Sequence, residues 1–216
     1  MSELHEWFMC NKLSINFEKT NYMILELNEY INDVIKSFNL SPSIKNVNIN
    51  RTTLTKYLGV WIDDMLNWKP HIDSMVKKNA NFIGMIYKKR SLIPYACRKY
   101  LYFSLIYSRV IYGIEVFGSA NKSVLTPLLI SCNRVLRALQ EKPRHYPVSR
   151  LYFNFHTLSV FDLFKFFILN LVYRSNNMKS SLPSVINSMF LLNASVHNYN
   201  TRSSSLIHMN HNFHFP

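Results

Sequence analysis

The apolar residues of this chain change their spacing near Trp68, and that change constrains the fold more than any other feature of the sequence. Before Trp68, short segments rich in Ile, Val, Thr and Tyr have the character of strands. After it, apolar residues recur at steps of three and four, which places them on one face of a helix. The first such stripe comprises Ile72, Met75, Val76, Ala80, Ile83, Ile86 and Tyr87. We therefore expect strands in the first third of the chain and helices in the rest.

Three strands are predicted before Trp68, over residues 22–27, 44–49 and 53–62, after a short amphipathic helix over residues 3–12. Pro42, in a run of Asn, Ser and Pro, marks a loop between the first two strands. An element of this size buries little apolar surface by itself. We expect it to be a small α+β part of a larger whole.

Further helices are predicted over residues 95–117, 125–139 and 160–176, with Gly118 as a stop and a connector over residues 141–147. The chain has 4 glycines among 216 residues, which suits long helices better than a turn-rich β-sandwich. The expected fold class is therefore α+β, mostly α. We divide the chain into residues 1–67, 68–142 and 143–216, the last with an irregular tail.

Positive charge is concentrated in the middle of the chain. Residues 77–150 carry 14 Lys and Arg against 2 Asp and Glu, whereas residues 1–76 carry 7 against 9. A basic field of this kind suggests a polyanionic partner, either nucleic acid or an anionic membrane surface. A solvated helical face is the plainer alternative.

The cations recur at helical spacing. Lys77 and Lys88 are eleven residues, or about three turns, apart, and Lys78 and Lys89 repeat this spacing beside them. A line of cations on helical faces can follow a phosphate backbone. The residues expected to make such contacts are Lys77, Lys78, Lys88, Lys89, Arg90, Arg98, Arg109, Arg134 and Arg137.

No segment predicts a membrane span, because the most apolar stretch, residues 100–117, is interrupted by charges and falls short of the roughly 20 apolar residues required. Cys10, Cys97 and Cys132 are widely spaced and form no metal-binding pair. This usage suggests small hydrophobic residues in a reducing compartment. We expect a soluble intracellular protein with no membrane partner, in either the nucleus or the cytoplasm.

Three short strings go beyond composition. They are NKLSINFEKT at residues 11–20, KYLGVWID at residues 56–63 with Trp68 and His71 after it, and HNYNTR at residues 197–202. In this order and spacing they resemble strings of the reverse transcriptases of jockey-like non-LTR retrotransposons. The resemblance extends from about Trp7 to Arg202. It implies a carboxy-terminal fragment of an RNA-directed DNA polymerase.

The resemblance implies roles for several of these residues. Lys19 would lie in the last palm motif, where its ammonium could contact the departing pyrophosphate. A primer grip would be formed by Lys56, Tyr57, Leu58 and Gly59, with the glycine allowing close approach of a backbone. Residues 1–67 would be the distal palm with this grip. The helices up to residue 142 would form the thumb, which holds the primer–template by its backbone.

The catalytic carboxylates of such a polymerase, which hold two Mg²⁺ ions about 4 Å apart, would precede Trp7. Asp63 and Asp64 are a tempting substitute, but we interpret them as a strand-end turn because no third carboxylate lies nearby in a comparable strand. We expect no catalytic residue, no metal site and no bound cofactor in this chain, with Mg²⁺ only in the full-length polymerase. The expected partners are an RNA/DNA primer–template and the missing upstream polymerase region.

Two other interpretations are compatible with the sequence. A basic helical interaction module could use the same face to bind another protein or a membrane. A decayed element remnant would have no selected function.

Overall fold

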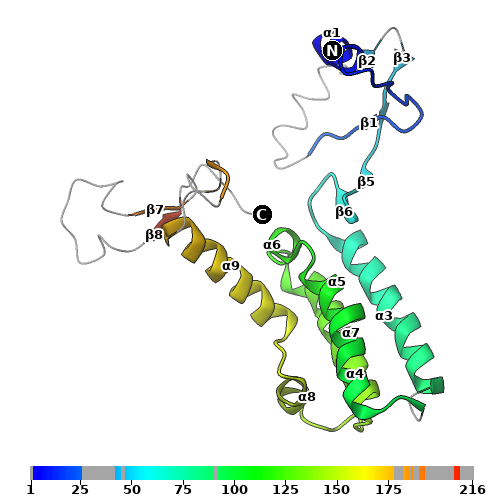
Figure 1. Ribbon diagram of the computed structural model, residues 1–216, viewed down its shortest axis with the longest axis vertical. Coiled ribbons are helices and arrows are strands. Elements are labelled where there is room, and N and C mark those ends of the chain that lie inside the picture. Colours follow the sequence, from blue (N-terminus) through cyan, green and yellow to red (C-terminus); the bar gives the residue numbers. More distant parts are fainter. Residues whose placement is uncertain are drawn as a thin grey trace. The chain divides into compact units, whose positions relative to one another are not determined.

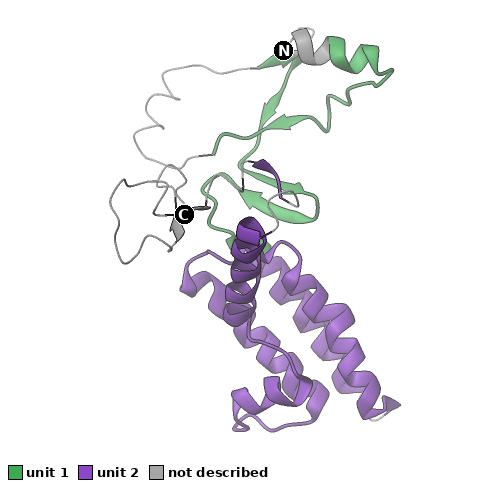
Figure 2. Cartoon of the chain, turned by 60° about the vertical axis from the view of Figure 1, so that its left-hand side comes forward, with its two compact units in different colours: residues 1–71 green, residues 72–216 purple. Residues whose placement is uncertain are grey.

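Helices account for most of the secondary structure in the computed structural model, and the strands are short (Figure 1). The fold class is α+β and mostly α, as predicted. The structure describes residues 2–25, 42–44, 47–89, 92–177, 182–184, 186, 190–192 and 207–209. They belong to two compact units, residues 1–71 and 72–216 (Figure 2). The predicted boundary at residue 67 lies just before this division, whereas residues 143–216 share a unit with most of the predicted thumb.

Among its described residues, the first unit contains one helix, the start of a second and three strand pairs. Helix α1 spans Ser2–Cys10, and the parallel pair is β1 (Asn21–Tyr22) with β4 (Asn50–Arg51). The antiparallel pairs are β2 (Ser43–Ile44) with β3 (Val47–Asn48), and β5 (Leu54–Tyr57) with β6 (Val60–Asp63).

These strands are shorter than the sequence predicted. The segment 44–49 is divided between β2 and β3, and the segment 53–62 is a hairpin and not a single strand. Period-two patterns continue through a tight two-residue turn, so the pattern alone did not reveal the hairpin. Residues 26 and 27 of the first predicted strand lie outside the described residues.

The second unit is helical. Its helices are α3 (Lys69–Lys89, which begins in the first unit), α4 (Tyr95–Tyr102), the π-helical η2 (Phe103–Tyr107), α5 (Ser108–Ile111), α6 (Ile114–Phe117), α7 (Lys122–Gln140), α8 (Val148–Phe155) and α9 (Val160–Asn177). An antiparallel pair follows, β7 (Phe190–Leu192) with β8 (Ile207–Met209).

The predicted single helix over residues 95–117 is broken in the structure. The break lies at Tyr112, which is extended, and Gly113, whose φ of 74° is left-handed. Glycine adopts that conformation without a steric cost. The apolar run across this region concealed the break because residues on both sides of it are buried. Helix α8 was not predicted, since eight residues after Pro147 give too short a periodic signal.

Helix α7 lies at the centre of the second unit's core. The residues Leu128, Val135, Leu136 and Leu139 on its apolar stripe are fully buried. Helices α4, α8 and α9 all pack against α7. Burial of this stripe stabilises the unit by about 1.5–3 kcal/mol for each large side chain.

Helix α3 buries a narrower stripe than predicted. Ala80 and Tyr87, assigned to that stripe from the sequence, are exposed. The buried residues of the helix include Ile72, Met75, Asn79, Phe82 and Ile86. One face of α3 thus packs inward, and its other faces remain available.

Gly118 ends α6, as predicted, and it also lets α6 approach α9. A Cβ at this position would overlap the carbonyl oxygen of Ile114 and the ring of Phe164. Side chains larger than hydrogen therefore do not fit at this contact.

Among the described residues no single helix is long and apolar enough to cross a membrane. Helices α8 and α9 meet that requirement only as a pair, bent by 51°.

Candidate nucleic-acid interface

The β5–β6 hairpin presents the residues predicted to form a primer grip. Its strands pair as far as Tyr57 and Val60, so Leu58 and Gly59 alone form the loop. Both have positive φ, 45° at Leu58 and 90° at Gly59, the combination of a type I′ turn that matches hairpin twist. Glycine takes this conformation freely, whereas a leucine there is strained. The turn itself therefore uses the conformational freedom of Gly59.

Side chains at the tip of the hairpin face solvent. Tyr57 is 64% exposed and Leu58 is 72% exposed. The ammonium of Lys56 lies 5.9 Å from the ring centre of Trp61, its partner across the hairpin. A cation, an aromatic ring and an apolar side chain are therefore exposed together at one end of a rigid turn. Such a tip can lie against a sugar–phosphate chain.

Asp63 is the last residue of β6, and its side chain stabilises the turn that leads into α3. Its carboxylate accepts hydrogen bonds from the backbone N–H groups of Asn67 and Trp68, both at 2.9 Å. The predicted strand-end turn is present, but the Asp63 carboxylate is half-buried and bonded to the backbone, whereas solvated acids were predicted. Because both oxygens of Asp63 accept hydrogen bonds from backbone N–H groups, this carboxylate stabilises the turn.

The tryptophan and histidine that follow the second string are part of the same junction. Trp68 and His71 are buried, and Nδ1 of His71 accepts a hydrogen bond of 3.4 Å from the backbone N–H of Trp61. This bond joins β6 to the first turn of α3. The residues that follow the second string thus connect the β5–β6 hairpin to the first turn of α3.

Lys19 lies in a turn before β1, and its side chain is exposed. Its backbone N–H donates to the side-chain Oδ1 of Asn16 at 3.2 Å. The position leaves the ammonium accessible to an anion, and the predicted pyrophosphate contact stays a prediction.

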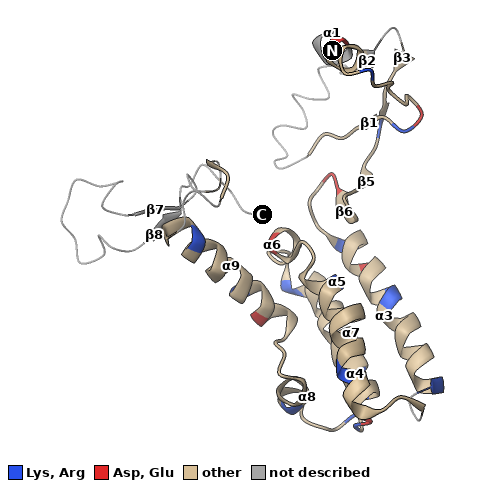
Figure 3. Cartoon of the chain, viewed as in Figure 1, with Lys and Arg blue, Asp and Glu red and all other residues tan. Residues whose placement is uncertain are grey.

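Helix α3 carries the four lysines predicted to follow a phosphate backbone. All four, Lys77, Lys78, Lys88 and Lys89, are exposed. Figure 3 shows blue segments, which mark Lys and Arg, along α3. Positions 77 and 88 are about 16 Å apart along the helix and differ by roughly 20° around it. Arg90 lies outside the described residues. Helix α3 therefore presents two groups of cations on one side, one near its middle and one at its end.

Arg98, also predicted as a phosphate contact, is turned into the protein. It is buried, and its Nε donates to the carbonyl of Ile93 at 2.9 Å. Its Nη1 lies 3.3 Å from the carbonyl of Leu139 and 3.2 Å from a carboxylate oxygen of Glu141. The structure thus uses Arg98 to hold the C-terminal end of α7, and we leave it out of the interface.

Arg109 likewise has a partner within the helical unit. Its Nη1 donates to Oδ1 of Asn79 at 3.1 Å, and Asn79 is 1% exposed. The Asn79 amide also lies 4.0 Å from Sγ of Cys132. Burial raises the pKa of the Cys132 thiol to about 12, against an opposing effect of Arg109. These three side chains form a polar link between α3, α5 and α7.

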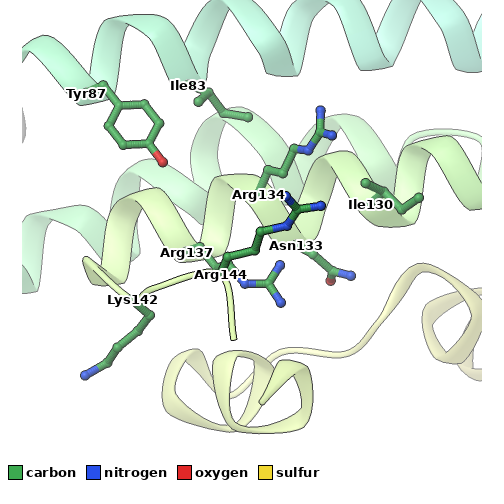
Figure 4. Close-up of a pocket in the computed structure, with 8 residues that line it drawn as sticks. All are labelled: Ile83, Tyr87, Ile130, Asn133, Arg134, Arg137, Lys142 and Arg144. Carbon is green, nitrogen blue, oxygen red and sulfur yellow. The ribbon is translucent and has the colours of Figure 1, made fainter. Parts of the chain in front are cut away.

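Arg134 and Arg137 line a pocket between α3, α7 and the connector that follows α7 (Figure 4). We call it the cationic pocket; its volume is about 470 Å³. Its lining residues are Ile83, Tyr87, Ile130, Asn133, Arg134, Arg137, Lys142 and Arg144. Lys142 and Arg144 were not predicted from the sequence, because a connector has no period that would place its side chains on a helical face. A count of charges near the end of α7 could have found them.

Within the described residues, no three His, Cys, Asp or Glu side chains come together in a way that could hold a metal ion. His208 lies in β8, whereas His211, His214 and the third string at residues 197–202 lie outside the described residues.

Comparison with known proteins gives one informative similarity. No family model and no solved structure matches the chain. The chain is 24% identical over 168 residues to a protein of Drosophila melanogaster described as a probable RNA-directed DNA polymerase from transposon BS. The match covers 73% of this chain but 17% of the fly protein, so the chain spans a small part of that relative's length. The similarity supports an origin from the reverse transcriptase of a mobile element.

Proposed function

We propose that this chain is the part of a retroelement RNA-directed DNA polymerase that holds the primer–template. In this proposal the β5–β6 hairpin is the primer grip of a distal palm element, and helices α3–α7 are the thumb. The chain comes from the carboxy-terminal side of a jockey-like polymerase. It binds nucleic acid and does not polymerise alone.

The observation that carries this proposal is the exposed lysine array of α3. Helix α3 contains five lysines against a single acid, Asp73. The four lysines from Lys77 to Lys89 point outward while the opposite face is buried. A rigid helix with cations at this spacing can neutralise several phosphates of one strand without reading base sequence.

The inward position of Arg98 and Arg109 makes the proposed interface smaller than the charge total suggests. Much of the basic charge of the helical unit lies on α3 and near the end of α7. We therefore expect binding to depend on few residues, each exposed and without a structural task. Charge reversal at these few residues therefore tests the proposed interface directly.

The test measures binding of the purified chain to a fluorescently labelled RNA/DNA hybrid duplex by anisotropy, over a series of salt concentrations. We expect the logarithm of the association constant to fall linearly with the logarithm of the salt concentration. Reversal of Lys77, Lys78, Lys88 and Lys89 to Glu should abolish binding while the circular dichroism spectrum stays unchanged. With Mg²⁺ and nucleotides added to the same mixture, we expect the primer to keep its length.

A matched control reverses four exposed cations away from α3, at Lys12, Lys122, Arg150 and Lys165. It changes the net charge of the chain by the same amount and should retain most of the binding. Equal losses in both variants would show that binding reflects net charge alone and would contradict the proposed interface. Binding that did not respond to salt would contradict phosphate contact altogether.

A further inference from the structure

Among the residues that the structure describes, four cations and no carboxylate line the cationic pocket. Glu141, which lies between Arg137 and Lys142 in sequence, forms an ion pair with Arg98 at 3.2 Å. Like charges gathered in one concavity repel each other and attract an anion into it. Figure 4 shows the guanidinium group of Arg144 between that of Arg134, which is turned toward α3, and that of Arg137, which is turned toward the connector, whereas Lys142 points away. The three arginines therefore define the anion-binding part.

Arg137 has an unused donor at this place. Its Nε is buried and has no hydrogen-bond partner among the described residues. Its Nη2 makes only a long bond of 3.5 Å to the carbonyl of Tyr146. Because Nε is buried, a ligand can reach only the Nη groups of Arg137, and Nη2 is held only weakly by the chain itself. Phosphate oxygens suit a guanidinium because they accept two of its N–H bonds at once.

The α3 side of the pocket has a different chemistry. It is formed by Ile83 and Tyr87, of which Tyr87 is 55% exposed, whereas Ile130 lies on α7 one turn before Arg134. An exposed tyrosine ring with apolar neighbours is a platform for a nucleobase or a sugar. At the floor, Oδ1 of Asn133 accepts a bond of 2.8 Å from the Tyr152 hydroxyl, which orients the Asn133 amide. The pocket thus combines an anion site with an aromatic wall.

The volume of the pocket limits the ligand. About 470 Å³ lies toward the lower end of the range of roughly 300–1,000 Å³ typical of small-molecule sites. One nucleotide fits such a space, whereas a base-paired duplex does not enter a pocket. A nucleotide of a single strand can turn its base inward because no pairing or stacking has to be broken.

From these observations we propose that the cationic pocket binds one nucleotide of a single-stranded nucleic acid, with its phosphate on Arg134, Arg137 and Arg144 and its base or sugar against Tyr87. The inference rests on the proposed function and adds a second, structurally distinct contact to it. Tyr87 directly precedes Lys88 and Lys89 of the proposed duplex interface. A strand that leaves the end of α3 therefore passes the mouth of the pocket.

The test compares a labelled ten-nucleotide oligothymidylate with the hybrid duplex, in anisotropy at one salt concentration. The double variant Arg134→Gln/Arg144→Gln removes two exposed arginines, so it should fold normally. We expect it to weaken single-strand binding by about tenfold or more and duplex binding by less than about threefold. Tyr87→Leu should weaken single-strand binding by at least about fivefold, the lower limit for loss of one stacking contact.

The control variant Arg150→Gln/Lys165→Gln loses the same charge at exposed positions outside the pocket. It should weaken both ligands slightly and equally. Thymidine monophosphate should displace the oligonucleotide at lower concentration than inorganic phosphate does. Equal potency of the two competitors would show a bare anion site and overturn the nucleotide assignment.

The two proposals fail in distinguishable ways. If the pocket variants bind the single strand as well as the control does, the pocket inference is overturned, while duplex binding through the α3 lysines still stands. Equal weakening of single-strand and duplex binding in the pocket variants would likewise overturn the single-strand assignment. If the unmodified chain binds neither ligand, the proposed function fails and the inference fails with it.

Discussion

The sequence predicted that Arg98 contacts a phosphate, whereas the structure shows it bonded within the protein. Replacing Arg98 with methionine tests which of these roles it has. Methionine keeps much of the length and apolar character of the arginine stem but removes the guanidinium. Three acceptors lose a donor: the carbonyls of Ile93 and Leu139 and the carboxylate of Glu141. The Leu139 carbonyl lies in the last turn of α7, where helical carbonyls have no intrahelical partner. Arg98 therefore caps that helix end and is favoured by its dipole.

The expected loss of stability follows from how exposed the hydrogen-bond acceptors of Arg98 are. A hydrogen bond from a charged donor contributes about 1.5–3 kcal/mol, and Arg98 makes two such bonds to carbonyls in a buried setting. The Glu141 side chain is 48% exposed, so water replaces its lost partner and that ion pair adds no more than about 1 kcal/mol. We expect Arg98→Met to lower the free energy of unfolding by about 3–5 kcal/mol.

The assay is urea unfolding followed by circular dichroism, with Arg134→Met as the control in an exposed position of α7. The control should change the free energy of unfolding by less than about 0.5 kcal/mol. Binding of the labelled oligothymidylate responds in the opposite order. Arg98→Met should leave the salt dependence of that binding unchanged, whereas Arg134→Met should reduce its slope by about 0.7, because the proposed pocket places Arg134 on a phosphate of the single strand. A stable Arg98→Met variant with a reduced salt slope would refute this reasoning and place Arg98 on the nucleic acid.

Two further predictions concern packing and ionisation. Gly118→Ala should lower the free energy of unfolding by about 1–3 kcal/mol in urea titration because its Cβ overlaps Phe164, whereas Gly84→Ala, which meets no atom within 4 Å, should raise it by about 0.5–1 kcal/mol. In thiol titration of the native chain, the exposed Cys10 and Cys97 should react quickly and Cys132 only after unfolding. Burial raises the pKa of Cys132 from 9.0 to about 12, so its thiol favours the folded state fully below pH 9 and loses that contribution as the pH rises toward 12. Cys132→Ala should remove this part of the alkaline loss of stability, measured by urea unfolding at several pH values.

The sequence pattern alone predicted those elements whose conformation depends on residues close together in the chain. The helical period from Ile72 to Ile86 predicted α3, and the apolar stripe from Leu125 to Leu139 predicted the buried face of α7. The turn after β6 at Asp63 was predicted from its position at a strand end. In each of these cases neighbours in sequence decide the conformation, so a periodic pattern carries the information.

Other features depended on contacts between distant segments. The break at Gly113 lies inside an apolar run and gives no periodic signal. The cationic pocket brings Tyr87 of α3 together with Arg137 of α7 and Arg144 of the connector. No spacing within one segment predicts such an arrangement, because it arises when α3 and α7 pack against each other.

The sequence by itself determined that this chain is mostly helical, that its basic charge lies in its middle third, and that it resembles reverse transcriptases of mobile elements. Those properties follow from composition, period and local strings. The tertiary structure alone decided which cations face solvent. Arg98 and Arg134 are both arginines on helices of a basic region, yet burial pairs the first with a carbonyl of α7 and leaves the second lining a pocket. The physical reason is that a cation's role depends on the acceptors and the water around it, and these are fixed only when the helices pack.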